Sequence, residues 1–175
     1  NSFLEYSYMV KKLNFRIGLI PFVKIGSSMI IHLVFLLFSS VIFNFYSYKA
    51  DWIYLQLIYY ISATTLLVAG IGLITSSLAV YLRDTSQIVA IMIQIGFWAI
   101  PIVWGPEVLT PKWRLLFLAN PIYYLVEGYR DTLIRNVFFW EKGIYSIYFW
   151  VITALIWIAG IKCFRNLKPY FADVL

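Results

Sequence analysis

The chain of 175 residues has very few of the side chains on which most enzymes and secreted proteins depend. Its single cysteine, Cys163, excludes a disulfide within one copy. Its single histidine, His32, has no Cys, Asp or Glu at ligand spacing, which argues against a metal site. No HExxH, GxSxG, Cys-His cluster or glycine-rich phosphate loop occurs in the sequence. The common hydrolytic and nucleotide-binding chemistries therefore lack their signatures.

Charged residues are scarce as well. They make up 13% of the chain, against about a quarter in soluble domains, whereas 62% of residues are hydrophobic and 20% aromatic. This composition predicts an integral membrane protein. The net charge of +6 does not point to nucleic acid, because the basic residues lie beside apolar runs and form no long basic tract. Anionic headgroups and membrane topology explain the charge better.

Four uncharged runs are long enough to cross a bilayer, which takes about 20 residues. They predict an all-α fold, a single transmembrane domain over residues 1–175, with spans at 21–48, 52–82, 85–104 and 143–162. The second run is longer than a span needs, so it must tilt, protrude, or kink at Gly70 or Gly72. These two glycines, with Ser76 and Ala79, form a small-residue stripe that predicts close helix packing, within one copy or across a dimer.

The basic residues predict how the chain is oriented in the membrane. Lys11, Lys12 and the basic tail 163–175 favour a cytoplasmic location for both ends of this chain. Residues 1–16 are predicted to form a short amphipathic cytoplasmic helix with Leu4 and Tyr8 on one face. It either lies on the lipid headgroups or docks into another protein.

The segment after the third run has a different character. Only 12 residues, 115–126, are apolar, and Pro121 lies among them. This is too short for a span, so we expect a re-entrant helical hairpin on the outer side over residues 105–135, with Asn120 capping a helix start. Non-helical backbone at this depth is tolerated when it is buried in protein or lines a water-filled cavity. The stretch is therefore predicted to form part of a passage.

Two carboxylates follow the proline at helical spacing, Glu127 and Asp131. They suit acid–base work in principle. Because Arg130 and Arg135 flank them, an ion-pair network is the favoured interpretation. Four tryptophans in this half of the chain fit an interfacial belt, or they face the passage: Trp98, Trp104, Trp113 and Trp140. His32 in the first run is interpreted as a structural hydrogen-bonding residue or as part of the passage lining.

Several short pieces, in order, carry a resemblance: Tyr81-Leu82-Arg83-Asp84, Gln94 to Ile102, Asn120-Pro121, Tyr129-Arg130 and the tail from Phe164. Together they resemble the permease subunits of ABC-type exporters of lipid-linked polysaccharide, such as O-antigen, capsule and teichoic acid. One departure is Arg16, where the family often carries proline. The resemblance implies a six-span inner-membrane permease, of which this chain lacks the first two spans, acting as a homodimer with two copies of a nucleotide-binding ATPase subunit.

The same resemblance assigns roles to residues. The cytoplasmic coupling helix would engage the ATPase through Phe3, Leu4, Glu5, Tyr8, Lys11 and Lys12. Arg83 and Asp84 would form a cytoplasmic hinge. The outer gate and passage would involve Phe97, Trp98, Pro101, Trp104, Asn120, Pro121, Tyr129 and Arg130.

The chain itself is expected to be a transport subunit with no cofactor, catalytic residue or metal, since ATP and magnesium belong to the partner. Two alternatives remain open at this point. One is an exporter of small hydrophobic compounds with the same architecture, and the other is a membrane enzyme acting on lipid-linked sugars.

Overall fold

The computed structural model describes residues 20–46, 52–82, 84–102, 117 and 119–170. Every regular element within these residues is a helix, as the predicted all-α fold requires. Three of the described helices are long and apolar enough to cross a membrane: α3 (Ile20–Phe45), α4 (Gln56–Tyr81), which continues the short helix η2 (Trp52–Leu55), and α8 (Ile144–Leu167). The chain is therefore a membrane protein.

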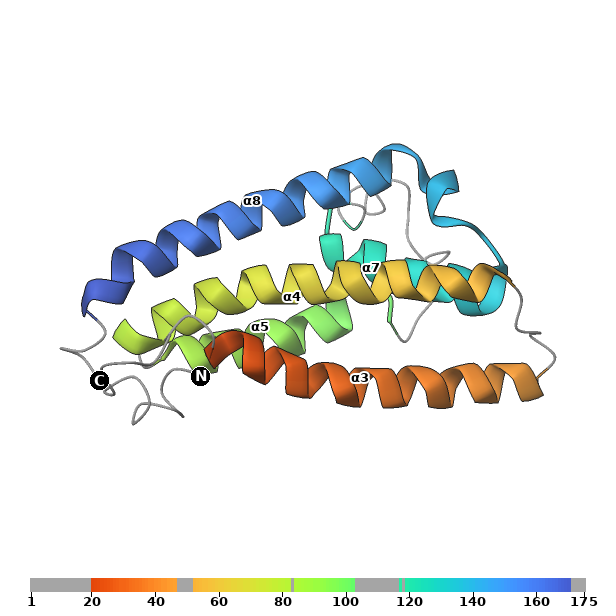
Figure 1. Ribbon diagram of the computed structural model, residues 1–175, viewed down its shortest axis with the longest axis horizontal. Helices are drawn as coiled ribbons and strands as arrows, with labels where there is room; N and C mark the ends of the chain where they lie inside the picture. Colours follow the sequence, from red (N-terminus) through yellow and green to blue (C-terminus); the bar gives the residue numbers. More distant parts are fainter. Residues whose placement is uncertain (1–19, 47–51, 83, 103–116, 118, 171–175) are drawn as a thin grey trace.

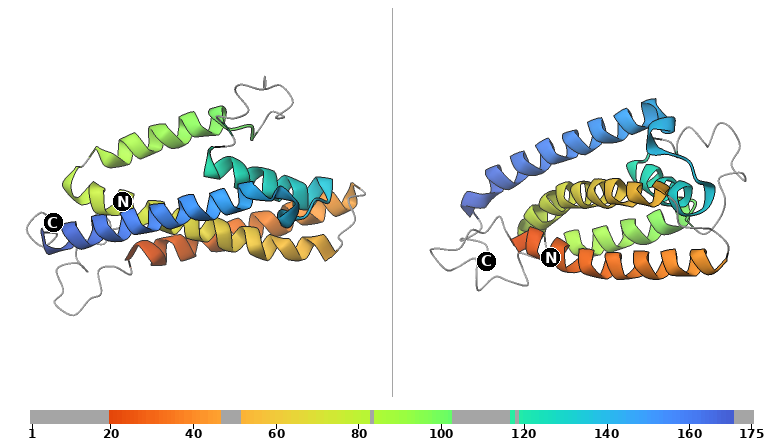
Figure 2. Two further views of the ribbon diagram at one scale, coloured as in Figure 1. Left: turned by 90° about the horizontal axis from the view of Figure 1, so that it is seen from above. Right: turned by 45° about the vertical axis from the view of Figure 1, so that its right-hand side comes forward.

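The helices alternate in direction around a central α4. Figures 1 and 2 show α3 and α8 on different sides of α4, and α5 (Thr85–Ala99) beside the second half of α4. The start of α3 and the end of α8 lie at the same end of the molecule (Figure 1). Successive apolar helices thus run in opposite directions (Figure 1).

Two boundaries differ from the prediction. α5 ends at Ala99, and Ile100 is extended (φ −79°, ψ 139°) because a residue before proline is driven out of the helical region. Its 15 residues reach only about 22 Å, less than the ~30 Å of the hydrocarbon core. At the other end of the chain α8 continues to Leu167, five residues beyond the predicted end of the span at 162.

Small residues bring the long helices together. A Cβ on Gly70 would lie 3.0 Å from Ile156 of α8, and one on Gly160 would lie 3.0 Å from the carbonyl oxygen of Gly70. Gly72 faces α3, where Ile25 would lie 3.3 Å from an added Cβ. The small-residue stripe therefore packs helices within one copy of the chain. Trp157 adds a polar tie, since its Nε1–H donates to the Leu66 carbonyl at 2.8 Å.

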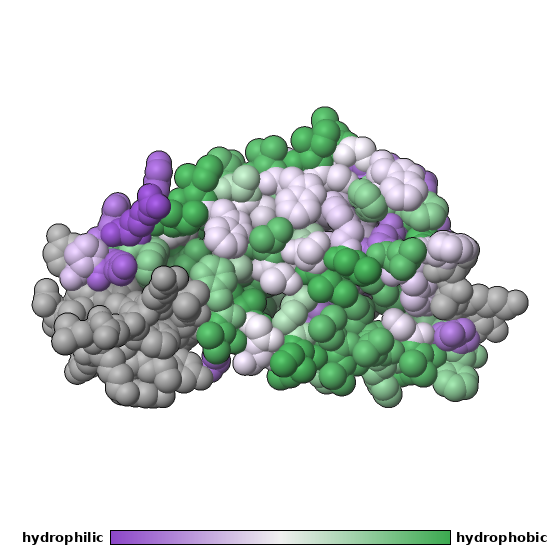
Figure 3. Space-filling view, in the orientation of Figure 1, coloured by the Kyte–Doolittle hydropathy of each residue, from purple (hydrophilic) through white to green (hydrophobic). Residues whose placement is uncertain are grey.

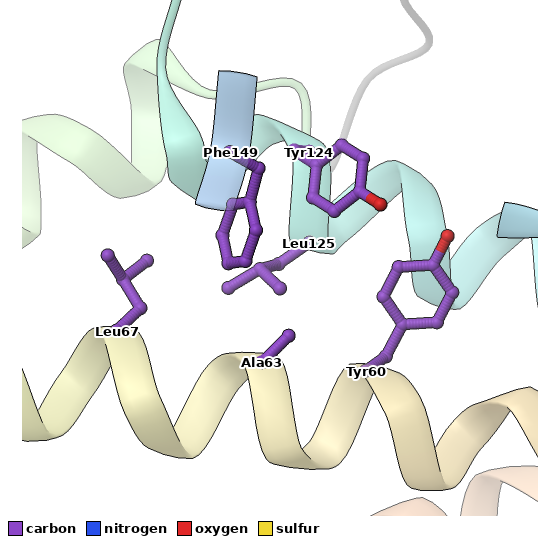
Figure 4. Packing of buried hydrophobic residues seen from close by; sticks show 6 residues of the cluster. All are labelled: Tyr60, Ala63, Leu67, Tyr124, Leu125 and Phe149. Carbon is purple, nitrogen blue, oxygen red and sulfur yellow. The ribbon is translucent and has the colours of Figure 1, made fainter. Parts of the chain in front are cut away.

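Apolar side chains cover most of the outside. In Figure 3 they extend over the middle of the molecule, while strongly hydrophilic residues gather mainly toward its two ends. The buried core lies where the ten-residue helix α7 (Pro121–Arg130) packs against α4 and α8. Figure 4 shows its members converging from three helices: Tyr60, Ala63, Leu67, Tyr124, Leu125 and Phe149.

Candidate functional site

The helix α7 begins and ends at positions that its sequence dictates. Asn120 caps the start, because its Oδ1 accepts the Ile122 N–H at 3.0 Å, and Pro121 occupies the first helical position, where no donor is needed. The helix passes directly into a five-residue π-helical turn, η4 (Asp131–Arg135), which ends at Asn136 in the left-handed region (φ 55°). Such π turns occur often at functional sites.

Gly128 sets the distance between α7 and α4. A Cβ at this position would lie 2.1, 2.4 and 2.6 Å from three ring atoms of Tyr60, which is fully buried. Only a residue without a side chain lets the tyrosine ring lie against the helix backbone. Tyr60 also packs edge-on against Tyr59, with ring centroids 5.1 Å apart.

Five charged residues surround the end of α7, and we call them the α7 ionic cluster: Glu127, Arg130, Asp131, Arg135 and Lys142. Glu127 is the hub, with Oε1 accepting from Arg130 at 2.7 Å and Oε2 from Arg135 at 2.5 Å. Asp131 accepts from Arg135 at 3.1 Å and from Lys142 at 2.7 Å. The predicted ion-pair network is therefore confirmed, with Lys142 as a member that the prediction lacked.

The electrostatics of the cluster oppose acid–base catalysis. Burial acts to raise the pKa of Glu127, but hydrogen bonds from Arg130 and Arg135 and their charges outweigh it and leave the pKa below its ordinary value. The hydrogen bond to Glu127 raises the pKa of Arg135 in turn. Both groups therefore stay ionised around neutral pH, and the cluster holds charges in fixed positions.

Arg130 connects this cluster to the broken end of α5. Its Nη2 donates to the Ile102 carbonyl oxygen at 2.7 Å, while its Nη1 binds Glu127. Ile102 follows Pro101, which is fully buried. A carbonyl beyond the end of a helix has no intrahelical donor, and the guanidinium supplies one. The end of α5 and α7 are thereby tied through one side chain.

Lys142 enters from the other side, on η5 (Phe139–Lys142), just before α8 begins. Its ammonium lies 5.3 Å from the ring centroid of Tyr124 and 5.9 Å from that of Tyr60. Aromatic faces attract such a cation, more strongly where water is excluded. The lysine is 14% exposed and the Asp131 that it binds is 9% exposed. This pair therefore links the start of α8 to η4.

A chain of hydroxyl groups runs beside the cluster, and its proton direction follows from its two ends. Trp150 can only donate, and it does so to the Tyr59 hydroxyl at 2.9 Å. Ser146 donates to the Phe139 carbonyl at 3.1 Å, so it must accept from Tyr124 at 2.8 Å. Tyr124 in turn accepts from Tyr59 at 3.1 Å. With its only proton committed in a buried position, Tyr124 has a pKa well above its ordinary value, mainly because of burial.

Gln56 closes the site at the start of α4. Its amide nitrogen donates to Thr132 Oγ1 at 2.8 Å and to the Val137 carbonyl at 2.9 Å. Its Oε1 accepts the Phe139 N–H at 2.9 Å. One buried amide thus holds η4, the following extended residues and η5 against α4.

His32 and Tyr129 form a further link, between α3 and α7. The His32 Nε2 lies 3.1 Å from the Tyr129 hydroxyl, and that hydroxyl lies 3.1 Å from Thr64 Oγ1. Thr64 donates to the Tyr60 carbonyl, so Tyr129 donates to Thr64 and His32 must donate to Tyr129 from Nε2. This is the structural hydrogen bond that the sequence favoured for His32. Among the described residues no group of His, Cys, Asp and Glu could hold a metal ion.

The predicted gate residues divide into two groups. Pro101, Asn120, Pro121, Tyr129 and Arg130 lie in or beside the cluster. Phe97 and Trp98 project from α5, 44% and 69% exposed, with their rings packed edge to face.

Other predicted site residues fall elsewhere. Asp84 is exposed at the start of α5. Trp104, Arg83 and the coupling-helix residues Phe3, Leu4, Glu5, Tyr8, Lys11 and Lys12 lie outside the described residues, as do residues 105–116 and 118 of the predicted hairpin.

Sequence reasoning missed the residues that fix α7 to its neighbours: Gln56, Tyr60, Tyr124, Gly128, Thr132 and Lys142. One signal was available. A glycine in a short helix, beside a buried carboxylate, indicates close packing against another element. Its partner Tyr60 lies 68 positions away in the sequence, so the sequence could not show that these two residues are in contact.

The sequence of this chain is similar to those of known transport proteins. Residues 2–134 match the family model described as "ABC-2 type transporter". Two curated proteins from Klebsiella pneumoniae, both described as "O-antigen export system permease protein RfbA", are 26% identical to this chain over 106 residues. In both cases the aligned part covers 61% of this chain and 40% of the relative, so the chain spans about two fifths of the relatives' length.

Proposed function

Because the chain belongs to the ABC-2 type transporter family, we propose that it acts within the permease of an ATP-driven exporter. The cargo that we propose is a lipid-linked polysaccharide or teichoic acid, carried across the bacterial inner membrane. The similarity to two O-antigen export permeases carries this choice of cargo. In this proposal two copies of the permease enclose the passage and two copies of a separate ATPase drive it.

The α7 ionic cluster supports a role for α7 as an outer gate. A ten-residue helix is too short to cross the bilayer, and it lies beside the first half of α4 (Figures 1 and 2). It would form the returning arm of a re-entrant hairpin over 105–135. The Arg130 bond to Ile102 would transmit movement of α5 to this arm. Glu127 and Asp131 are buried, and charged residues inside membrane proteins commonly mark transport pathways.

Energy would reach the gate from the opposite end of the molecule. α4 extends over most of the long axis of the molecule with α3 running beside it, and α5 begins where α4 ends (Figure 1). An ATPase acting on residues 1–16 would displace the start of α3, and His32 couples α3 to Tyr129 of α7. This gives a mechanical route from one end of the molecule to the gate without any chemistry in the permease.

The ion pairs of Glu127 with two arginines argue against a catalytic role for its carboxyl group. A general acid needs a carboxyl that exchanges its proton near neutral pH, and Glu127 has a lowered pKa with both oxygens bonded to arginines.

A cellular experiment tests the export proposal. The permease gene is deleted from its host, and the surface glycan is measured together with the lipid-linked glycan retained inside. We expect the deletion to remove the surface polymer and to cause its precursor to accumulate, and plasmid-borne wild-type permease to reverse both effects. Unchanged surface glycan in the deletion strain, with increased retention of a small hydrophobic dye, would favour the alternative exporter.

A further inference from the structure

One face of α8 is turned away from the rest of the described molecule over most of its length. The buried residues of α8, Phe149, Thr153 and Gly160, lie on the opposite side, where Gly160 meets α4 and Phe149 belongs to the core. On the turned-away side the residues that recur every three or four positions are all exposed, and we call them the α8 stripe: Ile147, Val151, Leu155, Ile158, Lys162 and Arg165. Four apolar side chains are thus followed by two cations along a single stripe.

The change from apolar to basic side chains occurs where a bilayer changes from hydrocarbon to headgroups. From Ile144 to Ile161 α8 carries no charge and rises about 27 Å, close to the ~30 Å of the hydrocarbon core. From Lys162 to Leu167 it rises about 9 Å more, and the headgroup layer on each side of a bilayer is about 5–8 Å thick. Lys162 and Arg165 therefore lie at the height of the headgroups when the uncharged part of α8 spans the hydrocarbon.

The positive charge at this end of α8 is not balanced within the described part of the chain. Lys168 follows on the short helix η6 (Lys168–Tyr170), and Lys162, Arg165 and Lys168 are all exposed. None of the three forms an ion pair with a described residue, and α8 and η6 contain no carboxylate. Figure 3 shows strongly hydrophilic residues on the surface over the end of α8. The three cations are therefore available to an anionic partner.

The helix end that carries these cations is tied to α4. The Tyr81 hydroxyl, at the end of α4, donates to the Leu167 carbonyl oxygen at 3.1 Å. The Leu167 side chain is half-buried, and helical geometry places it on the opposite side of α8 from Arg165. A ligand that binds the cations therefore meets a helix that is already held in position, which lowers the cost of ordering on binding.

We propose that the basic end of the α8 stripe binds the headgroup of an anionic phospholipid. The planar guanidinium of Arg165 suits two phosphate oxygens, and the ammonium of Lys162 adds a second charge. The acyl chains of the same lipid would lie against Ile158 and Leu155, one and two turns deeper on the stripe. An acidic protein segment or inorganic phosphate would satisfy the charges but leave this apolar part uncovered, so the stripe as a whole favours a lipid. This lipid site needs only that α8 spans the membrane, whatever the cargo of the permease is.

The test measures lipid binding to the full-length permease assembled with its ATPase. The complex is purified in detergent and titrated with phosphatidylglycerol or with phosphatidylcholine of identical acyl chains, and native mass spectrometry gives the apparent Kd for each lipid. Lys162→Gln combined with Arg165→Gln removes the two cations of the stripe. As the matched control, Lys49→Gln combined with Lys112→Gln removes the same charge from segments that the sequence places on the other side of the membrane.

We expect wild type to bind phosphatidylglycerol more tightly than phosphatidylcholine. Each Lys or Arg close to an anionic headgroup changes affinity about fivefold, so the stripe variant should bind phosphatidylglycerol about 25-fold more weakly. Its affinity for phosphatidylcholine and its melting temperature in that lipid should equal those of wild type, because both side chains are exposed and neither has an ion pair with a described residue. The control variant should keep the wild-type affinity for phosphatidylglycerol. Lys162→Gln and Arg165→Gln, each made alone, should each show about a fivefold loss, which keeps the test decisive if the double variant does not fold.

Four results would overturn the lipid site. Equal binding of the two lipids to wild type would mean that the cations serve only membrane topology. Equal losses in the stripe and control variants would show attraction by net charge alone. Displacement of phosphatidylglycerol by inorganic phosphate at the same concentration would show an anion site that makes no use of the apolar part of the stripe. Binding of phosphatidylglycerol only after removal of the ATPase would assign the surface to that subunit. None of these results bears on the export proposal, which fails only if the deletion strain keeps its surface glycan.

Discussion

Glu127 binds two arginines of the α7 ionic cluster, one at each carboxylate oxygen, and its neutralisation tests the cluster directly. Glu127→Gln keeps the shape of the side chain but removes the charge and leaves one oxygen to accept. Arg130 and Arg135 would then share one side-chain acceptor oxygen at position 127 in place of two. The arginines are close to one another through this shared carboxylate, so their mutual repulsion would also be exposed.

The expected cost lies between two limits. Breaking a buried ion pair on one side costs about 3–5 kcal/mol, and an exposed pair contributes about 0–1 kcal/mol. The Glu127 side chain is 10% exposed, but those of Arg130 and Arg135 are 22% and 39% exposed, so solvent screens part of the interaction. We therefore expect a loss of about 2 kcal/mol in the free energy of unfolding. For a chain of this size that corresponds to a melting temperature lower by about 4 to 8 °C.

The assay is thermal unfolding of the purified permease at a series of pH values, with Glu141→Gln as the control. Glu141 is exposed and, among the described residues, accepts the Phe138 N–H at 3.2 Å, so its neutralisation should cost little stability. Because the pKa of Glu127 is lowered in the folded protein, its contribution is complete above its unfolded pKa of about 4.3 and is lost as the pH falls through the folded value. The difference in melting temperature between wild type and Glu127→Gln should therefore disappear at acidic pH. Equal melting temperatures for the two variants at pH 7 would refute the reasoning.

The remaining predictions concern packing and coupling. Gly128→Ala should destabilise the permease by about 1–2 kcal/mol, since overpacking against Tyr60 outweighs the gain in helix propensity, whereas Gly96→Ala, which has open space, should be neutral or stabilising in the same melting assay. Gly160→Ala should lower the melting temperature more than Gly26→Ala, because only the former meets a backbone oxygen, at 3.0 Å. Leu4→Ala combined with Tyr8→Ala should leave the permease in the membrane and ATP hydrolysis largely intact but stop glycan export; normal export would mean that residues 1–16 only lie on the membrane surface.

The long helices followed from the sequence because apolar length is a local property. The runs that predicted spans 21–48 and 52–82 appear as α3 and as η2 with α4. Local rules also gave the start of α7, with Asn120 as its cap. The end of α5 at Ala99 was missed, although Pro101 marks it locally, because the prediction followed the apolar run to residue 104. Each of these helix boundaries depends on one or two neighbouring residues, so the local sequence is sufficient to predict it.

The site depended on contacts between distant segments, and there the sequence was only partly informative. Glu127, Arg130, Asp131 and Arg135 share a helix face, so their network was predictable from spacing. Lys142 joined it only because the chain turns back after η4, where Asn136 has φ 55°. The partners of His32 and Gly128 lie on other helices altogether. No periodicity within one helix encodes such pairs.

The most direct test of the central claim is transport by purified components. The permease and its ATPase are reconstituted into vesicles containing a lipid-linked glycan, and access of an impermeant lectin to the glycan is followed after addition of ATP. Our account predicts that lectin binding rises only with ATP and only when both subunits are present, and that it is lost with Leu4→Ala and Tyr8→Ala together while hydrolysis continues. ATP-driven movement of a hydrophobic dye with no change in lectin binding would contradict it.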